Sequence, residues 1–197
     1  MRFRHTNLRT SQTFDCQLQC NQCTATKKAG GRCKNRVCIG TTVCHVHRKE
    51  LGVRVKKSTI PNAGKGLFAV KTFNKNSVIG EYSGESVSNA EISRRYGKSK
   101  RDNVPYGLGA NNAKGRVLDS ACRRSVMSLA NSGRTRTQSN AKFSDRIKPN
   151  GTINVRATKK IKAGAEIKIW YGADYWRTTK NSRHSTKYLT HLHCKPQ

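Results

Sequence analysis

The segment AEIKIWYGADYW, residues 165–176, most constrains what this chain can fold into. Its apolar side chains fall at every second position, and the residues between them are Glu, Lys and Trp. This alternation is typical of a strand with one buried face. We expect the strand to end at Gly172, after which further aromatic residues follow at once. The alternating residues are Ile167, Ile169 and Tyr171 on one face, and Glu166, Lys168 and Trp170 on the other.

Short apolar runs separated by turns recur from Val53 onward. Glycine and asparagine turns at 64–66 and 74–76 each precede such a run. Ser88-x-x-Glu91 is a capping box that predicts one short helix over about 89–96. The body is therefore predicted to be mainly β.

An internal echo indicates that two similar hairpins bracket this body. The spacing of four residues near its start recurs near its end: Ala69, Lys71, Phe73 and Ile79 match Ala157, Lys159, Ile161 and Ile167.

The net charge is extreme. The chain has 40 Lys and Arg against 10 Asp and Glu, a formal charge of +30. Such a surface attracts polyanions over a long range, which favours nucleic acid, including nucleosomal DNA, as a partner; solubility alone is the alternative. No run of about 18 apolar residues predicts a membrane span. The N-terminus lacks an apolar stretch behind its charges, so no secretory signal is expected.

Six of the eight cysteines lie between Cys16 and Cys44. Clustered cysteines with nearby histidines in a chain without a secretory signal favour a metal over disulfides. Residues 16–50 hold too few apolar side chains for a core, so a metal would supply folding energy. The spacing predicts a structural Cys3His zinc site at Cys23, Cys33, Cys44 and His47.

The same stretch resembles small zinc-binding segments of large DNA viruses, of the form C-x-A-T-K-K-x-G-x-x-C followed by C-x-x-H. Free thiols are one alternative to the zinc site. A second zinc ion in addition to the first is also left open, with the ligands Cys16, Cys20, Cys38 and His45.

Four segments of the body occur in a recognisable order. They are Gly64-Lys65-Gly66, then Glu81-Tyr82-Ser83-Gly84-Glu85, then Leu129-Ala130-Asn131-Ser132 with Asn140-Ala141, and last Tyr171-Gly172. Over residues 53–176 this order resembles the SET-domain lysine methyltransferases, particularly the compact viral type. The resemblance implies a SET-domain (β-clip) fold, mainly β, with short strands around a knot-like core. The expected organisation is a disordered basic arm (1–15), a zinc module (16–50), a SET domain (53–176) and a basic tail (177–197).

The resemblance implies methyl transfer from S-adenosylmethionine to a lysine amine. Gly64 and Gly66 would let the backbone approach the cofactor closely, and Asn131 would hold its adenine. The implied cofactor-binding residues are Gly64, Lys65, Gly66, Leu67, Tyr106, Asn131, Ser132 and Trp176.

Three tyrosines match the family's catalytic positions. Tyr171 would orient the amine and the transferable methyl group, and Tyr82 and Tyr175 would form aromatic walls of the lysine channel. Ordinary packing is the alternative for the two wall tyrosines. Asp119 and Glu166 are expected to satisfy local donors instead of taking part in catalysis.

The chain also departs from the family pattern. Ser132 replaces a His, Ser128 replaces an Arg, Trp170 replaces an Asp, and residues 133–138 carry an insertion. These departures leave open a catalytically weak or inactive SET-like protein that binds nucleic acid or chromatin.

The expected substrate is a basic core-histone tail, with a non-histone basic protein as the alternative. Nucleosomal DNA would bind the basic surface, and four carboxylates would gather near the site: Glu81, Glu85, Glu91 and Asp174. A tail helix around 187–193 or a second subunit would have to close the channel, and the compact viral type favours a homodimer. The expected location is inside the cell, in the nucleus of a host cell or with the virion.

Overall fold

A computed structural model describes most of the chain. The described residues are 2–6, 13–17, 21–37, 42–44, 46–47, 51–96, 107–109 and 115–173. Within these residues the protein is mainly β, as predicted, and no described helix is long and apolar enough to cross a membrane.

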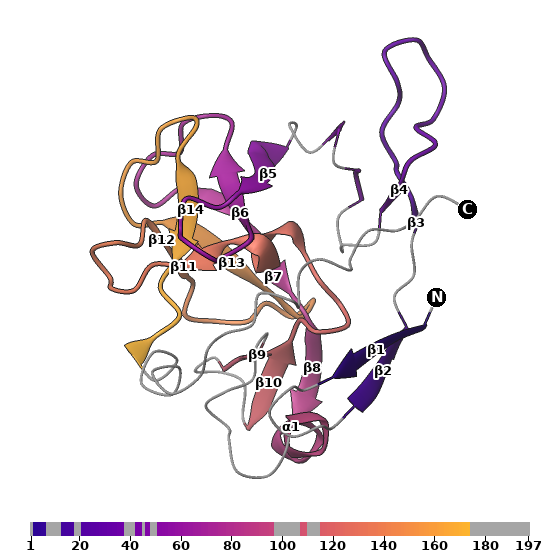
Figure 1. The fold of residues 1–197 in the computed structure, drawn as a ribbon, viewed down its shortest axis with the longest axis vertical. Coiled ribbons are helices and arrows are strands. Elements are labelled where there is room, and N and C mark those ends of the chain that lie inside the picture. The colour runs from indigo at the N-terminus through magenta and orange to yellow at the C-terminus, as the bar shows by residue number, and fades with distance from the viewer. Residues whose placement is uncertain are drawn as a thin grey trace.

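A seven-stranded sheet forms the body (Figure 1). The strand order is β5-β6-β14-β12-β13-β7, and β11 also pairs with β14. Most neighbours are antiparallel, but β11 and β12 both run parallel to β14. The strands are β5 (Val53–Lys57), β6 (Lys65–Ala69), β7 (Val78–Ser83), β11 (Asn131–Ser132), β12 (Ala141–Phe143), β13 (Thr152–Ala157) and β14 (Glu166–Ile169).

Two strand boundaries differ from the sequence prediction. Lys65 and Gly66 belong to β6 and not to the preceding turn, and β14 ends at Ile169, before Tyr171. Glu166 is buried as well as Ile167, so both faces of β14 are covered at its start. Residues 58–59 hydrogen-bond to Glu166, which explains why simple alternation fails there.

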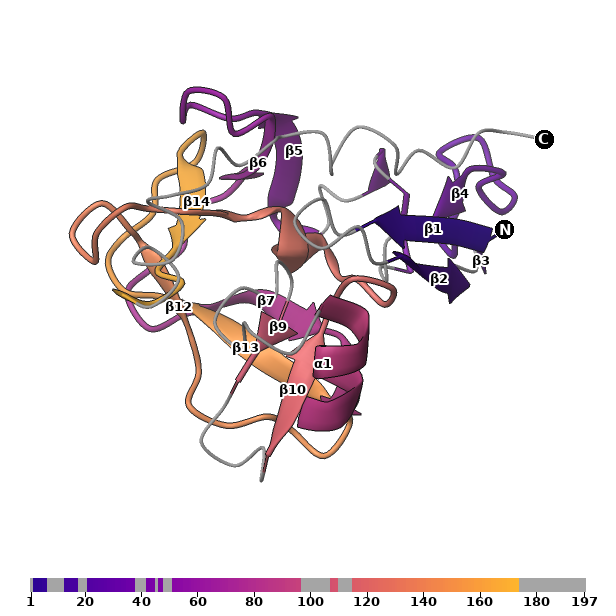
Figure 2. The same cartoon turned by 60° about the horizontal axis from the view of Figure 1, so that its bottom comes forward.

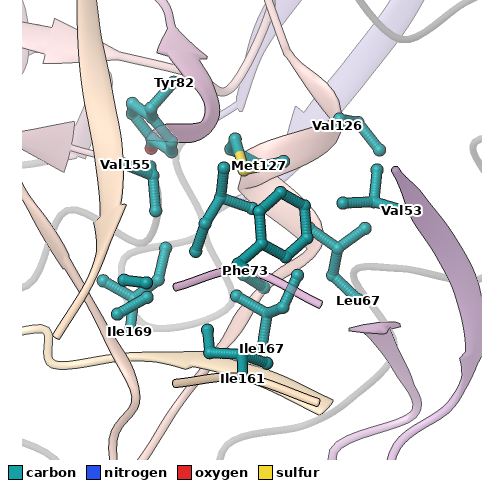
Figure 3. Packing of buried hydrophobic residues seen from close by; sticks show 14 of the residues in the cluster. Val53, Leu67, Phe73, Tyr82, Val126, Met127, Val155, Ile161, Ile167 and Ile169 are labelled. Atoms are coloured by element: carbon teal, nitrogen blue, oxygen red, sulfur yellow. The ribbon is translucent and has the colours of Figure 1, made fainter. Parts of the chain in front are cut away.

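The main hydrophobic core is built from the inward-facing residues of the sheet (Figure 3). Leu67, Ile167 and Ile169 have no exposed surface, and Phe73 and Ile161 pack against them. Burying one such side chain contributes roughly 1.5–3 kcal/mol relative to leaving it in water. The core also includes Met127 of the 3-10 helix η3 (Val126–Leu129), whose end leads directly into β11.

The two echoed segments pair with each other. Phe73 and Ile161 exchange two backbone hydrogen bonds, each of 2.9 Å. The Ala69 N–H donates to the Ala165 carbonyl (2.9 Å), and at the equivalent place the Ala157 N–H donates to the Ser77 carbonyl (3.0 Å). The segments around residues 69–77 and 157–165 therefore lie side by side, related by a local pseudo-twofold axis.

A smaller sheet and one helix adjoin the end of β7. Figure 2 shows α1 beside β10. The Ser88 hydroxyl accepts a 3.2 Å hydrogen bond from the Glu91 N–H, so the predicted N-cap is confirmed. Ile92 and Tyr96 are the buried residues of the helix. The sheet order is β8-β10-β9, and the elements are β8 (Glu85–Ser88), α1 (Asn89–Tyr96), β9 (Gly107–Leu108) and β10 (Arg116–Asp119).

The N-terminal part contains two short antiparallel pairs. β3 (Asn21–Gln22) pairs with β4 (Arg36–Val37). β1 (Arg2–Thr6) pairs with β2 (Thr13–Gln17), although we expected a disordered arm over 1–15. The register places Phe3 opposite Cys16 and His5 opposite Phe14. Cross-strand pairing thus supplies the order that a search for long periodic runs missed.

Candidate active site and metal site

Asn131 joins three segments that are distant in sequence. Its Nδ2 donates to the Lys65 carbonyl (3.0 Å), the Ser58 hydroxyl (3.1 Å) and Glu166 Oε1 (3.2 Å). The pairing of β11 with β14, in which Asn131 lies opposite Lys168, fixes its position. Asn131 thus holds the start of β6 against β14.

Glu166 is a buried carboxylate with several donors around it. It accepts from the Ser58 hydroxyl (2.7 Å), the Thr59 N–H (2.8 Å) and the Thr59 hydroxyl, in addition to Asn131. Burial raises the pKa of Glu166, but the hydrogen bonds from Thr59, Ser58 and Asn131 outweigh it and lower the pKa below its usual value. Glu166 is therefore ionised at neutral pH, and it satisfies local donors as expected.

The two glycines of the Gly-Lys-Gly segment have different roles. A Cβ on Gly66 would lie 2.2 Å from Glu166 Oε1, so the close approach is to a carboxylate of the chain itself. Gly64 has a φ of +68° and open space where a Cβ would be. We expected both glycines to leave room beside the backbone for a cofactor. Only Gly64 has such open space.

Tyr171 lies beside Asn131. Its phenol donates to the Ala130 carbonyl, and its N–H donates to the Ser132 hydroxyl at 3.3 Å. The ring is half-buried against the main core. Hydrogen bonds thus connect the Gly-Lys-Gly segment to Asn131, and the backbone next to Asn131 to the phenol.

Tyr82 is buried at the end of β7, with 6% of its surface exposed. Its ring meets the ring of Phe143 edge to face, with centroids 5.2 Å apart. Tyr82 belongs to the core cluster against which Tyr171 packs. Leu67 also lies in that core with no exposed surface, and its contact with the cofactor stays a prediction.

Three predicted site residues lie outside the described residues: Tyr106, Tyr175 and Trp176.

Three of the four carboxylates that we expected to attract a basic substrate are engaged in ion pairs. Glu81 pairs with Lys148. Glu85 and Glu91 both pair with Arg95 at 2.7 Å, and the guanidinium also contacts the fully buried Asp119. Tyr96 donates to both oxygens of Asp119 at 3.0 and 3.1 Å. The ion pairs of Glu85 and Glu91 hold α1 on β8 and β10. Asp174, the fourth carboxylate of the expected groove, lies outside the described residues, and the acidic groove stays a prediction.

The insertion at residues 133–138 lies between two segments that both pair with β14. Asn140 pairs its side chain with β14, since Nδ2 donates to the Glu166 carbonyl and Oδ1 accepts from the Lys168 N–H, both at 2.8 Å. A Cβ on Gly133 would lie 2.5 Å from Ser139 Oγ, so glycine is needed where the inserted loop closes. The loop therefore leaves the pairing of β11 and β12 with β14 intact.

The four predicted zinc ligands come together. The ligand atoms of Cys23, Cys33, Cys44 and His47 lie within 4.8 Å of one another. Cys33 Sγ and Cys44 Sγ are 3.9 Å apart, and His47 Nδ1 is 3.4 and 3.6 Å from the sulfurs of Cys44 and Cys23. A tetrahedral zinc would have edges of about 3.8 Å between sulfurs and about 3.6 Å between sulfur and nitrogen. The cluster therefore fits zinc.

Further donors surround these sulfurs. Asn35 Nδ2 donates to Cys44 Sγ (3.3 Å), and the Cys44 N–H donates to Cys23 Sγ (3.2 Å). Such contacts orient thiolate ligands. The alternative second zinc set cannot be compared, because the side chains of Cys16, Cys20, Cys38 and His45 lie outside the described part.

Comparison with known proteins decides the family. The family model for the SET domain matches residues 64–172, which is more than half of the chain. The chain belongs to the SET-domain family. Members of this family are protein-lysine methyltransferases. No curated protein sequence matches the chain.

Solved structures agree with this assignment. An active polycomb repressive complex 2 in its stimulated state matches with a TM-score of 0.52 and 28% identity, covering 61% of this chain and 15% of that one. The complex from Chaetomium thermophilum bound to GSK126 matches with a TM-score of 0.52 and 26% identity, covering 65% and 17%. Another structure of the Chaetomium thermophilum complex has a TM-score of 0.50 and 28% identity, covering 61% and 15%. The chain thus spans less than a fifth of these larger proteins.

Sequence reasoning missed two residues of the site, Ser58 and Thr59. They precede the Gly-Lys-Gly segment in a short polar loop and donate to Glu166. The signal in the sequence was Glu166 itself, an acid expected to satisfy local donors that the sequence did not identify.

Proposed function

We propose that this chain is an S-adenosylmethionine-dependent protein-lysine N-methyltransferase that acts on a core histone tail. The observation that carries the proposal is the convergence of Tyr171, Asn131 and the Gly-Lys-Gly segment in one hydrogen-bonded cluster. The first and last of these segments lie more than a hundred residues apart in the sequence, and their convergence is what the family's chemistry requires.

The residues present fit the cofactor in part. Gly64 leaves open space beside the backbone, and Lys65 offers a cation next to it. Asn131 would act chiefly by fixing the position of this segment, because its amide already donates to Lys65, Ser58 and Glu166. When bound, S-adenosylmethionine supplies the methyl group and a positive sulfonium.

Tyr171 is the proposed catalytic residue. Because its phenol donates to the Ala130 carbonyl, the ring is held in one orientation and the oxygen lone pairs can accept from a lysine amine. Catalysis of this kind works by positioning and electrostatics. Tyr82 would form an apolar wall of the lysine channel, where loss of water favours the neutral amine. We further propose that Tyr175 completes the wall and that Tyr106 and Trp176 contact cofactor.

A histone tail is the proposed substrate because of the relatives. A polycomb repressive complex 2 structure in complex with H3K27me3 and H3K27M matches at 27% identity, with a TM-score of 0.50. Since Glu81, Glu85 and Glu91 are ion-paired, recognition of a basic tail would depend on backbone pairing and channel fit more than on net charge. We propose a nuclear, chromatin-associated location on the same grounds.

The direct test is mass spectrometry of recombinant core histones incubated with the full chain and S-adenosylmethionine. We expect methyl groups on lysines of a histone tail. If the histones stay unmodified while a non-histone basic protein is methylated, the proposed substrate is wrong. If no protein is methylated, the proposed activity is wrong.

We also propose that Cys23, Cys33, Cys44 and His47 bind a structural zinc ion. The fit of the ligand distances to a tetrahedron supports this. With three thiolates and one imidazole, the site has no open position for a substrate. Metal analysis of the purified chain should find zinc in stoichiometric amounts, and its absence would remove the proposal.

A further inference from the structure

Two acid-free segments lie next to each other in the body. Residues 51–80 contain six Lys or Arg and no Asp or Glu, and residues 157–165 contain three Lys and no acid. The hydrogen bonds between Phe73 and Ile161 and between Ala69 and Ala165 join these segments. The fold thus combines two basic stretches of sequence into one basic surface.

The described carboxylates lie mostly elsewhere. Glu81 is on β7, which is at the opposite edge of the main sheet from β5. Glu85, Glu91 and Asp119 surround Arg95 between α1, β8 and β10, at the end of the body farthest from β5 and β6 in Figures 1 and 2. Glu166 is buried beneath the 58–59 loop. The acids named here therefore lie away from the paired segments 51–80 and 157–165, or are buried.

The basic surface is hollowed, and two of its ammonium groups lie over aromatic rings. A depression of about 460 Å³ lies between Arg54 and Lys56 of β5 and Phe68 of β6. Lys56 Nζ lies 5.5 Å from the centre of the nearly buried Phe68 ring, and Lys71 Nζ lies 5.6 Å from that of Phe73. Rings beneath the lysines restrict their motion, which reduces the entropy lost when an anion binds.

We propose that this surface, defined by Arg54, Lys56, Lys71 and Lys162, docks the phosphate backbone of duplex DNA. All four side chains are exposed. Positive charge without interspersed acid matches the dense, regular charge of a duplex. Single strands are a poorer match, because they are bound by stacking on exposed aromatic rings. In the described part of the chain the large exposed apolar residues are Val46, Leu51 and Val78, none of them aromatic.

The test is binding of the full chain to a fluorescent DNA duplex across a salt series. The variant replaces Arg54, Lys56, Lys71 and Lys162 by Gln, and a control with the same loss of charge replaces four exposed basic residues elsewhere: Arg116, Arg123, Lys142 and Arg146. We expect the surface variant to bind at least about tenfold more weakly. The plot of the logarithm of the association constant against the logarithm of the salt concentration should become shallower. The magnitude of its slope should decrease by about 3 to 4, at roughly 0.9 per phosphate contact. The control should change affinity by less than about threefold.

Several results would overturn the proposal. Equal weakening in the control would mean that only net charge matters. A single strand bound as tightly as the duplex would exclude backbone docking of duplex, and an RNA duplex bound more tightly would reassign the surface to RNA. Two double variants guard against misfolding of the fourfold variant. One combines Arg54→Gln with Lys56→Gln, and the other combines Lys71→Gln with Lys162→Gln. Each should show about half the change in slope, because each removes half of the proposed phosphate contacts. None of these readouts depends on methyl transfer.

Discussion

At the scale of single residues, Glu166 explains more of the site than its expected structural role suggested. Its two oxygens bind the 58–59 loop, touch Asn131 and fill the space over Gly66. A buried carboxylate that is fully hydrogen-bonded is costly to disturb, because each donor left unpaired loses its partner. Glu166 is thus a positioning residue for the Gly-Lys-Gly segment.

Replacing Glu166 by Gln keeps the shape of the side chain but turns an amide NH2 toward donors. We expect Glu166→Gln to lower the free energy of unfolding by about 1–3 kcal/mol and to weaken S-adenosylmethionine binding. Urea unfolding and titration calorimetry measure the two effects. Asp145→Asn, at an exposed carboxylate, is the control and should be neutral. If Glu166→Gln leaves both the free energy of unfolding and the affinity for S-adenosylmethionine unchanged, Glu166 does not position the Gly-Lys-Gly segment.

At the scale of elements, the α1–β8–β10 unit depends on charge. Hydrogen bonds from Arg94, opposed by burial and aided by Arg95, lower the pKa of Glu91 from 4.5 to about 2. A carboxylate with a lowered pKa in the folded state stabilises the fold above pH 4.5, and this contribution is lost as the pH falls toward 2. Solvent screening keeps it small, at about 1 kcal/mol.

The pH dependence of unfolding tests this contribution. Between pH 4.5 and 2, Glu91→Gln should lose less stability than the native chain, by about 1 kcal/mol. Loss of zinc in acid affects both proteins alike, so the difference between them isolates Glu91. Parallel curves for the two proteins would show that the ion pairs contribute nothing measurable.

The Cys3His cluster is the second element whose stability can be tested. Cys44→Ser should abolish stoichiometric zinc and the absorption of a tetrahedral site after cobalt substitution, because a hydroxyl is a poor zinc ligand. Cys194→Ser, outside the ligand set, should retain both. Full zinc content in Cys44→Ser would require another ligand.

Much of the element pattern could be predicted from the sequence. The helix cap at Ser88, the start of the β structure at Val53 and the four zinc ligands follow from local spacing, and the structure has them where expected. The end of β14 and the burial of Glu166 could not be predicted, because a loop more than a hundred residues earlier covers that face. Local patterns do not record such contacts.

At the scale of the whole molecule, the sequence indicated the size of the charge but not its distribution. Residues 51–80 and 157–165 become one surface only because the echoed segments pair. The acids at Glu85 and Glu91 looked available to a substrate, yet both are bound to Arg95. Only the fold separates the paired charges from the exposed basic ones.

Tyr171 and the Gly-Lys-Gly segment are proposed to form one methyl-transfer site. The most direct measurement compares the native chain with Tyr171→Phe, using calorimetry for S-adenosylmethionine and mass spectrometry for methylated histone. We predict that the cofactor affinity stays within about threefold while turnover falls by about 100-fold or more, because the lost hydroxyl positions the reacting groups without holding the cofactor. Native turnover in Tyr171→Phe, or no cofactor binding by the native chain, would contradict the account.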